Sequence, residues 1–557
     1  MMKPFKRLVS LSFLAALFLF AACNDEPVQL GEKTIVATPE QIDEKAEDLI
    51  QGVLKEMLDD GGHLADSFRL KNPHFVKALY EAASFQPLWS IEGVYRPWAD
   101  SLVQFIDSSY NYGLFPNAYH RDRLHRLHRE LVDDTAAEAR LDAARWAYND
   151  LLMTAAFIQL TTDLSRGRLF HDTVLAKDST LTPRLFQERF AVYKDSGNIA
   201  LSVLQPAHTG YRELQAALPQ FLRKANLKEY TRVESKDSLR LRSLLYKRLA
   251  EEDSLGIAPG ETPDSITLAK AIRKYQKIHK LKVDGKPGPE LFSSLNNTDL
   301  EKFIRIAITL DRYKSLPVLP EHYVWVNIPA YQLQVRQCDT VVLSSRIVVG
   351  KPQTRTPLLT SAITDMITYP KWHIPESIIE KEILPGLKKD PSYTIRKGYG
   401  IFDKDGNEID PRGVSWAKYK KGIPYRVIQG SGDANALGVL KFNFPNKYAV
   451  YLHDTNQRSL FSRSKRALSH GCVRVQAWQE LAKHLLVNDS LNAKNFVPLD
   501  SMNTWLARKE KHVIPVRKRM PLYIRYFTCE AKDDRIVFHE DIYAEDGKLR
   551  SKIYSQK

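Results

Sequence analysis

The sequence predicts a multidomain α+β protein in which helical domains precede a β-rich domain. A chain of 557 residues is too long for a single hydrophobic core and favours three or four domains. Apolar residues recur at helical spacing over residues 74–236. The period changes to strand-like alternation from Tyr323 onward, which indicates short strands joined by turns.

The first 22 residues have the pattern of an export signal. A basic start with Lys3 and Arg7 precedes an apolar run that is too short to span a bilayer. The run ends at Ala21-Ala22-Cys23, which is typical of a bacterial lipoprotein cleavage site. We therefore expect a lipoprotein signal peptide at 1–22, lipidation of Cys23, and a membrane-anchored protein in the periplasm of the bacterial cell envelope. The alternative is an ordinary secretory signal with an incidental cysteine.

Lipidation of Cys23 leaves three further cysteines, and an odd number in an exported protein suggests a free thiol. The strongest candidate for that thiol is Cys472. Cys338 and Cys529 lie in strand-like stretches, where we expect small apolar side chains that fill space and do not pair.

The formal net charge of +15 allows several kinds of partner. Nucleic acid, the cell wall and anionic lipid surfaces all attract basic proteins. No nucleic-acid-binding motif accompanies the charge, so we expect no nucleic-acid partner. A general surface property that only favours solubility is an equally good interpretation.

The N-terminal half is predicted to be helical. Residues 23–60 are polar and acidic-rich, and they favour a tether with one short helix near 42–58. A helical domain is expected over 61–240, with its clearest apolar periodicity at 142–164. A small helical module is expected over 241–300, and an ordinary helical hairpin without a ligand is the alternative. One face of its first helix is formed by Leu268, Ala271, Ile272, Tyr275 and Ile278. Leu291 and Leu295 begin its second helix.

The β-rich domain is expected over 321–488, closed by a helix at 479–486. An insert at about 370–428 is rich in proline and loops, and such an insert inside a domain is often a lid. Residues 489–557 contain two more strand-like stretches and are expected to pack on this domain. The predicted strands of its first part are 323–328, 333–335, 341–343 and 347–349.

The stretch Ser469-His470-Gly471-Cys472-Val473-Arg474 places a thiol near a second segment that ends in His453. Alternation puts Tyr451 and His453 on one face of a strand. Two neighbouring strands would bring the imidazole to the thiol, as cysteine nucleophilic catalysis requires. A lone cysteine is usually a buried filler, but the motif and its spacing favour catalysis. His470 is the rival base.

These residues resemble the signature of the L,D-transpeptidases with a YkuD-type catalytic domain, which cross-link bacterial peptidoglycan. The wider pattern resembles the large periplasmic subclass, strongly over 321–488 and loosely elsewhere. The resemblance implies a helical scaffold at 61–240, a peptidoglycan-binding module at 241–300 and a capping lid at 370–428. The supporting segments are 326–331, 349–351, 435–438, Lys441-Phe442 and 451–455.

The resemblance also implies roles for individual residues. Cys472 is the expected nucleophile and His453 its base, with the carbonyl of Asp454 orienting the ring. Backbone N–H groups of Gly471 and Cys472 are the expected oxyanion donors. Arg474 would hold a substrate carboxylate, although many family members carry asparagine there. The expected substrate-binding residues are Tyr451, Ser469, His470 and Arg474; for Tyr451, simple packing is the alternative.

The reaction implied is the formation of 3→3 cross-links through a cysteine thioester, with peptidoglycan stem peptides as donors and acceptors. The same site would act as an L,D-carboxypeptidase if water replaced the acceptor amine. A non-catalytic peptidoglycan-binding lipoprotein is the alternative from another class. No metal-ligand spacing, phosphate loop or dinucleotide fingerprint occurs, so we expect neither a metal nor a cofactor.

Overall fold

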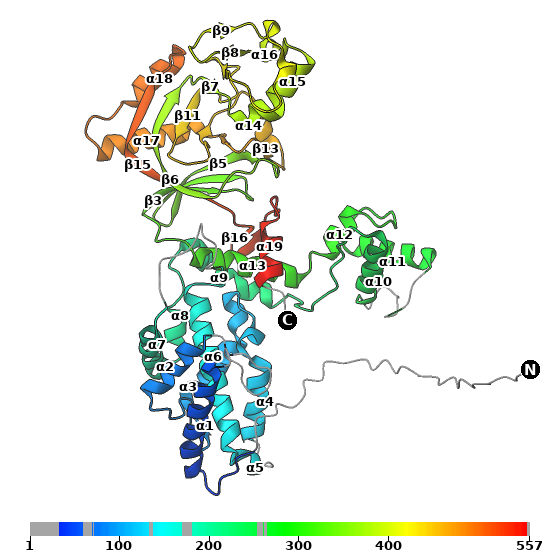
Figure 1. Cartoon of the computed structure of the whole chain (residues 1–557), viewed down its shortest axis with the longest axis vertical. Helices are drawn as coiled ribbons and strands as arrows, with labels where there is room; N and C mark the ends of the chain where they lie inside the picture. Colours follow the sequence, from blue (N-terminus) through cyan, green and yellow to red (C-terminus); the bar gives the residue numbers. More distant parts are fainter. Residues whose placement is uncertain are drawn as a thin grey trace, which may run out of the picture. The chain divides into compact units, whose positions relative to one another are not determined.

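A computed structural model describes residues 33–59, 70, 72–132, 137–169, 181–252, 260 and 264–553 (Figure 1). The expected signal peptide, the lipidation site Cys23 and the first part of the tether lie outside these described residues. The chain divides into two compact units. Unit 1 is drawn from Met1–Asp100, Asp122–Ile158 and Thr182–Phe190, and unit 2 from Ser101–Arg121, Gln159–Leu181 and Ala191–Lys557.

Unit 1 is helical around a buried carboxylate. Asp150 accepts hydrogen bonds from the Tyr80 hydroxyl at 2.6 Å and from the backbone N–H groups of Leu88 and Trp89. Burial raises the pKa of Asp150 to about 6. Its elements include α1 (Glu40–Asp59), α2 (Pro73–Ala82), α4 (Arg121–Val132), α5 (Ala137–Arg140), the hairpin β1 (Ser90–Ile91) and β2 (Val94–Tyr95), and much of α6 (Ala143–Ser165) and α7 (Pro183–Ser196).

Helix α1 differs from the expected polar tether. Ile42, Ala46, Ile50 and Leu54 are all buried, so one face of this 20-residue helix belongs to a core. Their four-residue spacing places them on one stripe of a helix. Charged residues occupy most other positions, which is why the segment as a whole looks polar.

The helical part of unit 2 holds a buried cluster around α13 (Asp299–Lys314). The small module has its own core, in which Ala271, Ile272 and Tyr275 of α11 meet Leu291 and Leu295 of α12. Ile278, expected on the same face, is instead 55% exposed. The helices are α3 (Pro97–Asp107), η1 (Ser109–Tyr112), η2 (Pro116–Tyr119), α8 (Asn198–Ser202), α9 (Thr209–Leu222), α10 (Ser238–Ala250), α11 (Ser265–Ile278) and α12 (Pro289–Leu295).

A nine-stranded sheet forms the rest of the unit 2 core, in the order β13-β5-β14-β12-β11-β6-β15-β3-β4. Because β4 also pairs with β5, the sheet closes on itself as a barrel. Inward side chains of these strands form one apolar cluster with α17 (Trp478–Asn492). The strands are β3 (His322–Asn327), β4 (Gln332–Gln337), β5 (Thr340–Gly350), β6 (Leu359–Thr368), β11 (Leu440–Asn443), β12 (Leu452–His453), β13 (Ala467–Ser469), β14 (Val473–Val475) and β15 (Val513–Arg525).

Two strand predictions are corrected. The stretches 341–343 and 347–349 are not separate strands, because β5 is continuous through the polar residues between them. The stretch before His453 forms a strand only at Leu452–His453, because Ala449 has a positive φ of 54° that ends regular pairing. Cys338 is also not a buried filler: it is exposed at the β4–β5 turn with φ 51°.

The insert forms a substructure with its own apolar cluster and a four-stranded sheet in the order β7-β10-β8-β9. After β15, the hairpin of β16 (Cys529–Lys532) and β17 (Arg535–Phe538) leads to α19 (Glu545–Ile553). None of the helices in the described ranges has the length and apolar content that a bilayer span requires. The remaining elements are β7 (Trp372–His373), α14 (Glu376–Ile378), the π-helix η4 (Ile379–Ile383), α15 (Leu384–Lys389), α16 (Tyr393–Arg396), β8 (Tyr399–Phe402), β9 (Glu408–Ile409), η5 (Pro411–Gly413), η6 (Trp416–Lys418), β10 (Arg426–Gln429), η7 (Arg458–Ser462) and α18 (Leu499–Ala507).

Candidate active site

The two residues expected to react lie on neighbouring strands. His453 ends β12, and Cys472 immediately precedes β14, which pairs with β12 in parallel. The register opposes His453 to Arg474, so alternation places Cys472, two residues earlier, on the same face as the imidazole. Cys472 is intermediate in exposure, so the residue is not sealed in the core.

The orientation of His453 is fixed by the backbone. Its Nδ1 lies 2.5 Å from the carbonyl oxygen of Asp454, and because a carbonyl only accepts, Nδ1 carries the proton. Asp454 is itself held, since its N–H donates to the Leu440 carbonyl and its side chain accepts from Val439 N–H and pairs with Arg458. Nε2 is therefore the nitrogen that can take a proton from a thiol.

Both reacting groups are neutral at rest. Burial lowers the pKa of His453 to about 3, with the Arg474 guanidinium as the second cause, and these outweigh the carbonyls of Asp454 and Leu437. Burial also raises the pKa of the Cys472 thiol. The N–H and hydroxyl of Tyr451 oppose that rise, so Tyr451 is the neighbour that best stabilises a developing thiolate. The site thus begins as thiol and imidazole rather than as an ion pair.

The loop that carries Cys472 is held by its own polar groups. The Ser469 hydroxyl donates to the Cys472 carbonyl at 2.6 Å and accepts from the Gly471 N–H at 3.1 Å. Gly471 has φ 126°, a conformation that only glycine adopts readily. The Gly471 N–H is therefore occupied, contrary to its expected role as an oxyanion donor. Cys472 N–H has no acceptor among the described residues, and it remains the donor next to the sulfur.

Two cations border the sulfur, and only one was expected. Lys441 opposes His453 across β11 and β12, and its Nζ lies 3.9 Å from the centre of the Tyr451 ring. Arg474 bonds only neutral groups, the side chains of Thr455 and Gln457, and its Nε is buried without a hydrogen bond. In the described part of the chain, neither cation pairs with a carboxylate. The segment Lys441-Phe442 contributed to the family resemblance, but no role at the site was expected for Lys441.

The insert reaches the site at two points. Nε2 of His470 lies 2.5 Å from Oε1 of Glu382, which belongs to the π-helix of the insert. Burial raises the pKa of the Tyr451 phenol, and the side chain of Trp372, at the start of the insert, lies near the Tyr451 hydroxyl and opposes that rise. His470 therefore contacts the insert, whereas the His453 imidazole lies on the same face as Cys472. The described residues hold no group of three or more His, Cys, Asp or Glu side chains arranged for a metal ion.

Comparison with known families agrees with this geometry. Residues 321–497 match the family described as the L,D-transpeptidase catalytic domain, of the YkuD type. This chain carries a YkuD-type L,D-transpeptidase catalytic domain. Residues 74–218 match the family described as the scaffold domain. The matched range therefore contains the insert, the Cys472 loop and every barrel strand except β15 (Val513–Arg525), while the scaffold match lies in the helical half.

A relative shares part of the chain. A Haemophilus influenzae (strain ATCC 51907 / DSM 11121 / KW20 / Rd) protein named "Putative L,D-transpeptidase" is 38% identical over 238 residues. The match covers 42% of this chain and 47% of that protein, so the chain spans about half the length of this relative. The likeness supports the assignment of the transpeptidase domain.

The neutral resting pair predicts how the transpeptidase domain responds to a small alkylating agent. Because only the thiolate reacts and the thiol pKa is raised, the alkylation rate of Cys472 by iodoacetamide should rise about tenfold per pH unit over roughly pH 5–8. The measurement is mass-spectrometric quantification of the Cys472 peptide in a Cys338→Ser background, which removes the exposed competing thiol. A rate that stays flat down to about pH 5 would indicate a thiolate–imidazolium pair instead.

Proposed function

We propose that the protein is a peptidoglycan L,D-transpeptidase that forms 3→3 cross-links between stem peptides during cell wall biogenesis. The observation that carries the proposal is that His453 ends β12 and Cys472 immediately precedes β14, the parallel neighbour of β12, with Nδ1 of His453 held by the Asp454 carbonyl. That arrangement leaves Nε2 as a base for the thiol. The matched catalytic domain and the name of the relative support the same reaction class.

The first half-reaction forms a thioester. The Cys472 thiol gives its proton to Nε2 of His453 while the sulfur attacks the carbonyl carbon of the third residue of a tetrapeptide stem. The tetrahedral intermediate collapses, the C–N bond to the terminal D-alanine breaks, and His453 gives the proton to the leaving amine. Because the imidazole is neutral at rest, it is ready to accept that proton when substrate arrives.

The second half-reaction transfers the acyl group. The side-chain amine of another stem attacks the thioester carbonyl, its proton passes to His453, and the sulfur leaves and recovers that proton. The thioester retains the acyl energy, so the cross-link forms without ATP. If water attacks in place of the amine, the product is a shortened stem and the enzyme is an L,D-carboxypeptidase.

The test is incubation of the full chain with tetrapeptide muropeptides, followed by mass spectrometry. A dimer that has lost one D-alanine supports the transpeptidase, and a tripeptide product supports the carboxypeptidase. No change, with wild-type Cys472 unmodified, would leave the non-catalytic peptidoglycan-binding lipoprotein as the function. The Cys472→Ala variant is the control, and it should give no product in either case.

We further propose that the insert at 370–428 caps the site as a lid. The contacts of Glu382 with His470 and of Trp372 with Tyr451 support this role, because both lie beside the Cys472 loop. The module at 241–300 is proposed to bind peptidoglycan, and Cys23 to anchor the chain to a membrane of the cell envelope in the periplasm. A covered site would favour the amine over water by excluding solvent.

Lys441 and Arg474 are proposed to bind carboxylates of the stem, since both lie near the sulfur without a carboxylate partner. Lys441→Met and Arg474→Met should each raise KM for a carboxylate donor by about tenfold, the value of one charge-assisted hydrogen bond. The measurement is steady-state kinetics with donors whose terminal carboxylate is free or amidated. Amidation of the donor carboxylate should lower the affinity of the wild type. It should lower the affinity of Arg474→Met little further, because that variant already lacks the guanidinium that binds the carboxylate.

The matched control is Arg463→Met, which removes an exposed arginine that lies on the same segment as the Cys472 loop. It should leave KM for both donors unchanged. Equal losses by Arg474→Met with the free and the amidated donor would exclude recognition of that carboxylate.

A further inference from the structure

We propose that Thr356 and Tyr543 are positioning residues that aim the Cys472 N–H at the oxyanion, so that the C-terminal segment is part of the active site. This inference rests on the proposed acyl-transfer function. Tyr543 lies beyond residues 321–497, which match the catalytic domain, and it is separated from Cys472 by much of the C-terminal segment. It nevertheless contacts the backbone that supports the Cys472 loop.

Thr356 makes the direct connection to the loop. Its hydroxyl donates to the Gly471 carbonyl and accepts from the Gly350 N–H, both at 2.8 Å, and its side chain is buried. The Gly471 carbonyl and the Cys472 N–H belong to the same planar peptide and point in opposite directions. Fixing the Gly471 carbonyl therefore fixes the direction of the Cys472 N–H. This N–H has no acceptor in the described part of the chain.

Two neighbouring hydrogen bonds also fix the backbone of the Cys472 loop. The Thr354 hydroxyl and the Lys351 N–H both donate to the Ser469 carbonyl at 3.0 Å. Gly350 permits the tight turn that brings these donors together, because a Cβ there would lie 2.1 Å from the Thr354 carbonyl oxygen. The turn 350–356 thus holds the carbonyls on both sides of His470.

Tyr543 holds that turn from outside the matched domain. Its hydroxyl donates to the Gly350 carbonyl at 2.6 Å and accepts from the Thr356 N–H at 3.1 Å. One phenol oxygen thereby connects both ends of the turn. The Tyr543 N–H in turn donates to the Tyr526 hydroxyl at 2.9 Å, and Tyr526 donates to Asp541.

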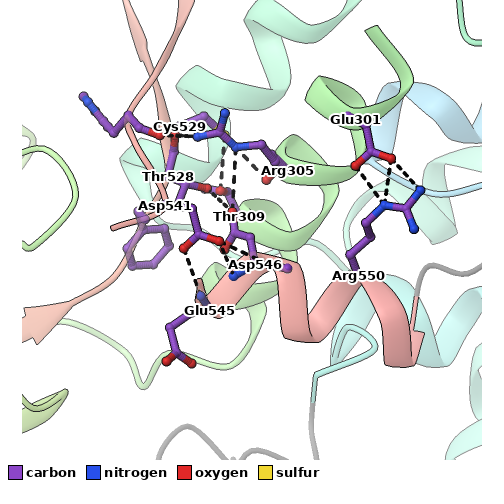
Figure 2. A network of polar contacts seen from close by, with 12 residues as sticks. Glu301, Arg305, Thr309, Thr528, Cys529, Asp541, Glu545, Asp546 and Arg550 are labelled. Carbon is purple, nitrogen blue, oxygen red and sulfur yellow. Dashed lines mark hydrogen bonds and ion pairs between the residues drawn. The ribbon is translucent and has the colours of Figure 1, made fainter. Parts of the chain in front are cut away.

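The C-terminal helix anchors this segment to α13, as Figure 2 shows. Arg550 of α19 makes a bidentate pair with Glu301 at the start of α13. Asp546 pairs with Arg312 at 2.7 Å and accepts from the Thr528 hydroxyl. Beside Asp546, Glu545 pairs with Arg355 inside the turn that holds the Cys472 loop. The helix that follows Tyr543 is therefore tied both to α13 and to the turn 350–356.

The expected contribution is that of an aligned oxyanion donor. Loss of one such donor typically lowers kcat about 10²–10³-fold. Misalignment without loss should cost less, so we expect Thr356→Val to slow acylation of Cys472 roughly 10–100-fold and Tyr543→Phe roughly tenfold. Thr356→Ser keeps the hydroxyl and should restore most of the rate.

The test compares two reactions of the same sulfur in the full chain. Acylation by a thiol-reactive β-lactam passes through an oxyanion, whereas alkylation by iodoacetamide does not. Thr356→Val and Tyr543→Phe should slow acylation and leave the alkylation rate within about twofold. Thr504→Val on α18, which removes an exposed threonine bond to the Asp500 carbonyl, is the control and should change neither rate.

Two results would overturn the inference. Acylation rates of Thr356→Val and Tyr543→Phe equal to the wild type would show that the turn does not aim the donor. Equal slowing of acylation and alkylation would show a general structural effect. Failure of the wild type to acylate at all, with normal alkylation, would instead contradict the proposed function itself.

Discussion

Replacing His453 by alanine is expected to lower the rate at which a thiol-reactive β-lactam acylates Cys472 by about 10²–10⁴-fold, the usual contribution of a general base. The thiol pKa is raised by burial, so almost no thiolate exists near neutral pH without a base. Nε2 of His453 is the proposed base, because Nδ1 is bound to the Asp454 carbonyl. The measurement is intact-protein mass spectrometry of the acyl-enzyme against time.

His470→Ala is the matched control for this prediction. Its imidazole pairs with Glu382 of the insert, so its loss should reduce acylation far less than the loss of His453. Alkylation by iodoacetamide should change little in either variant, because the resting thiol is not paired with an imidazolium. Similar acylation by the two variants would remove His453 from its proposed role.

Replacing Asp546 by alanine is expected to destabilise the contact of α19 with α13 by about 3–5 kcal/mol, the usual cost of breaking a buried ion pair. Asp546 and Arg312 are 4% and 5% exposed, and the Arg312 guanidinium would be left buried without its partner. Hydrogen exchange of the backbone amides of α13 and β16, followed by mass spectrometry, measures the loss of protection.

Two further variants define the cause of that loss. Asp500→Ala removes an exposed carboxylate from the first turn of α18, and it should cost less than about 1 kcal/mol. Asp546 also lies 3.9 Å from Arg305 Nε, so combining Asp546→Ala with Arg312→Met removes the more buried of two unpaired charges and should restore part of the protection. If the double variant is no more protected than Asp546→Ala, the buried charge is not the source of the instability.

Local periodicity predicted most of the regular structure. The apolar spacing at 142–164 appears as α6, and the alternation after Tyr323 appears as β3 and β4. Such signals depend on residues close in sequence, so they can be recognised without knowing which segments pack together. Predictions based on short stretches were less accurate: β5 continues through Ser344, and Ile278 faces solvent although its spacing matches the apolar face.

In the candidate site, too, local patterns were informative, whereas contacts between distant segments could not be predicted. Alternation on two segments and a specific motif predicted that Cys472 and His453 share a face, and the pairing of β12 with β14 agrees with that placement. Lys441 was not predicted as a site residue, because its position opposite His453 depends on the pairing of β11 with β12. Tyr543 could not be predicted either, since its bonds to Gly350 and Thr356 join segments nearly 200 residues apart in the sequence. The occupied N–H of Gly471 also follows from loop geometry alone.

The neutral state of the Cys472–His453 pair has a consequence for the oxidation of the sulfur. Peroxide and other oxidants attack the sulfur anion far faster than the protonated form, and oxidation beyond the sulfenic acid is irreversible for most proteins. A sulfur that keeps its proton at rest therefore reacts more slowly with such oxidants. The burial that keeps Cys472 in the thiol form, for which His453 is the proposed base, would thus also slow oxidation of the sulfur.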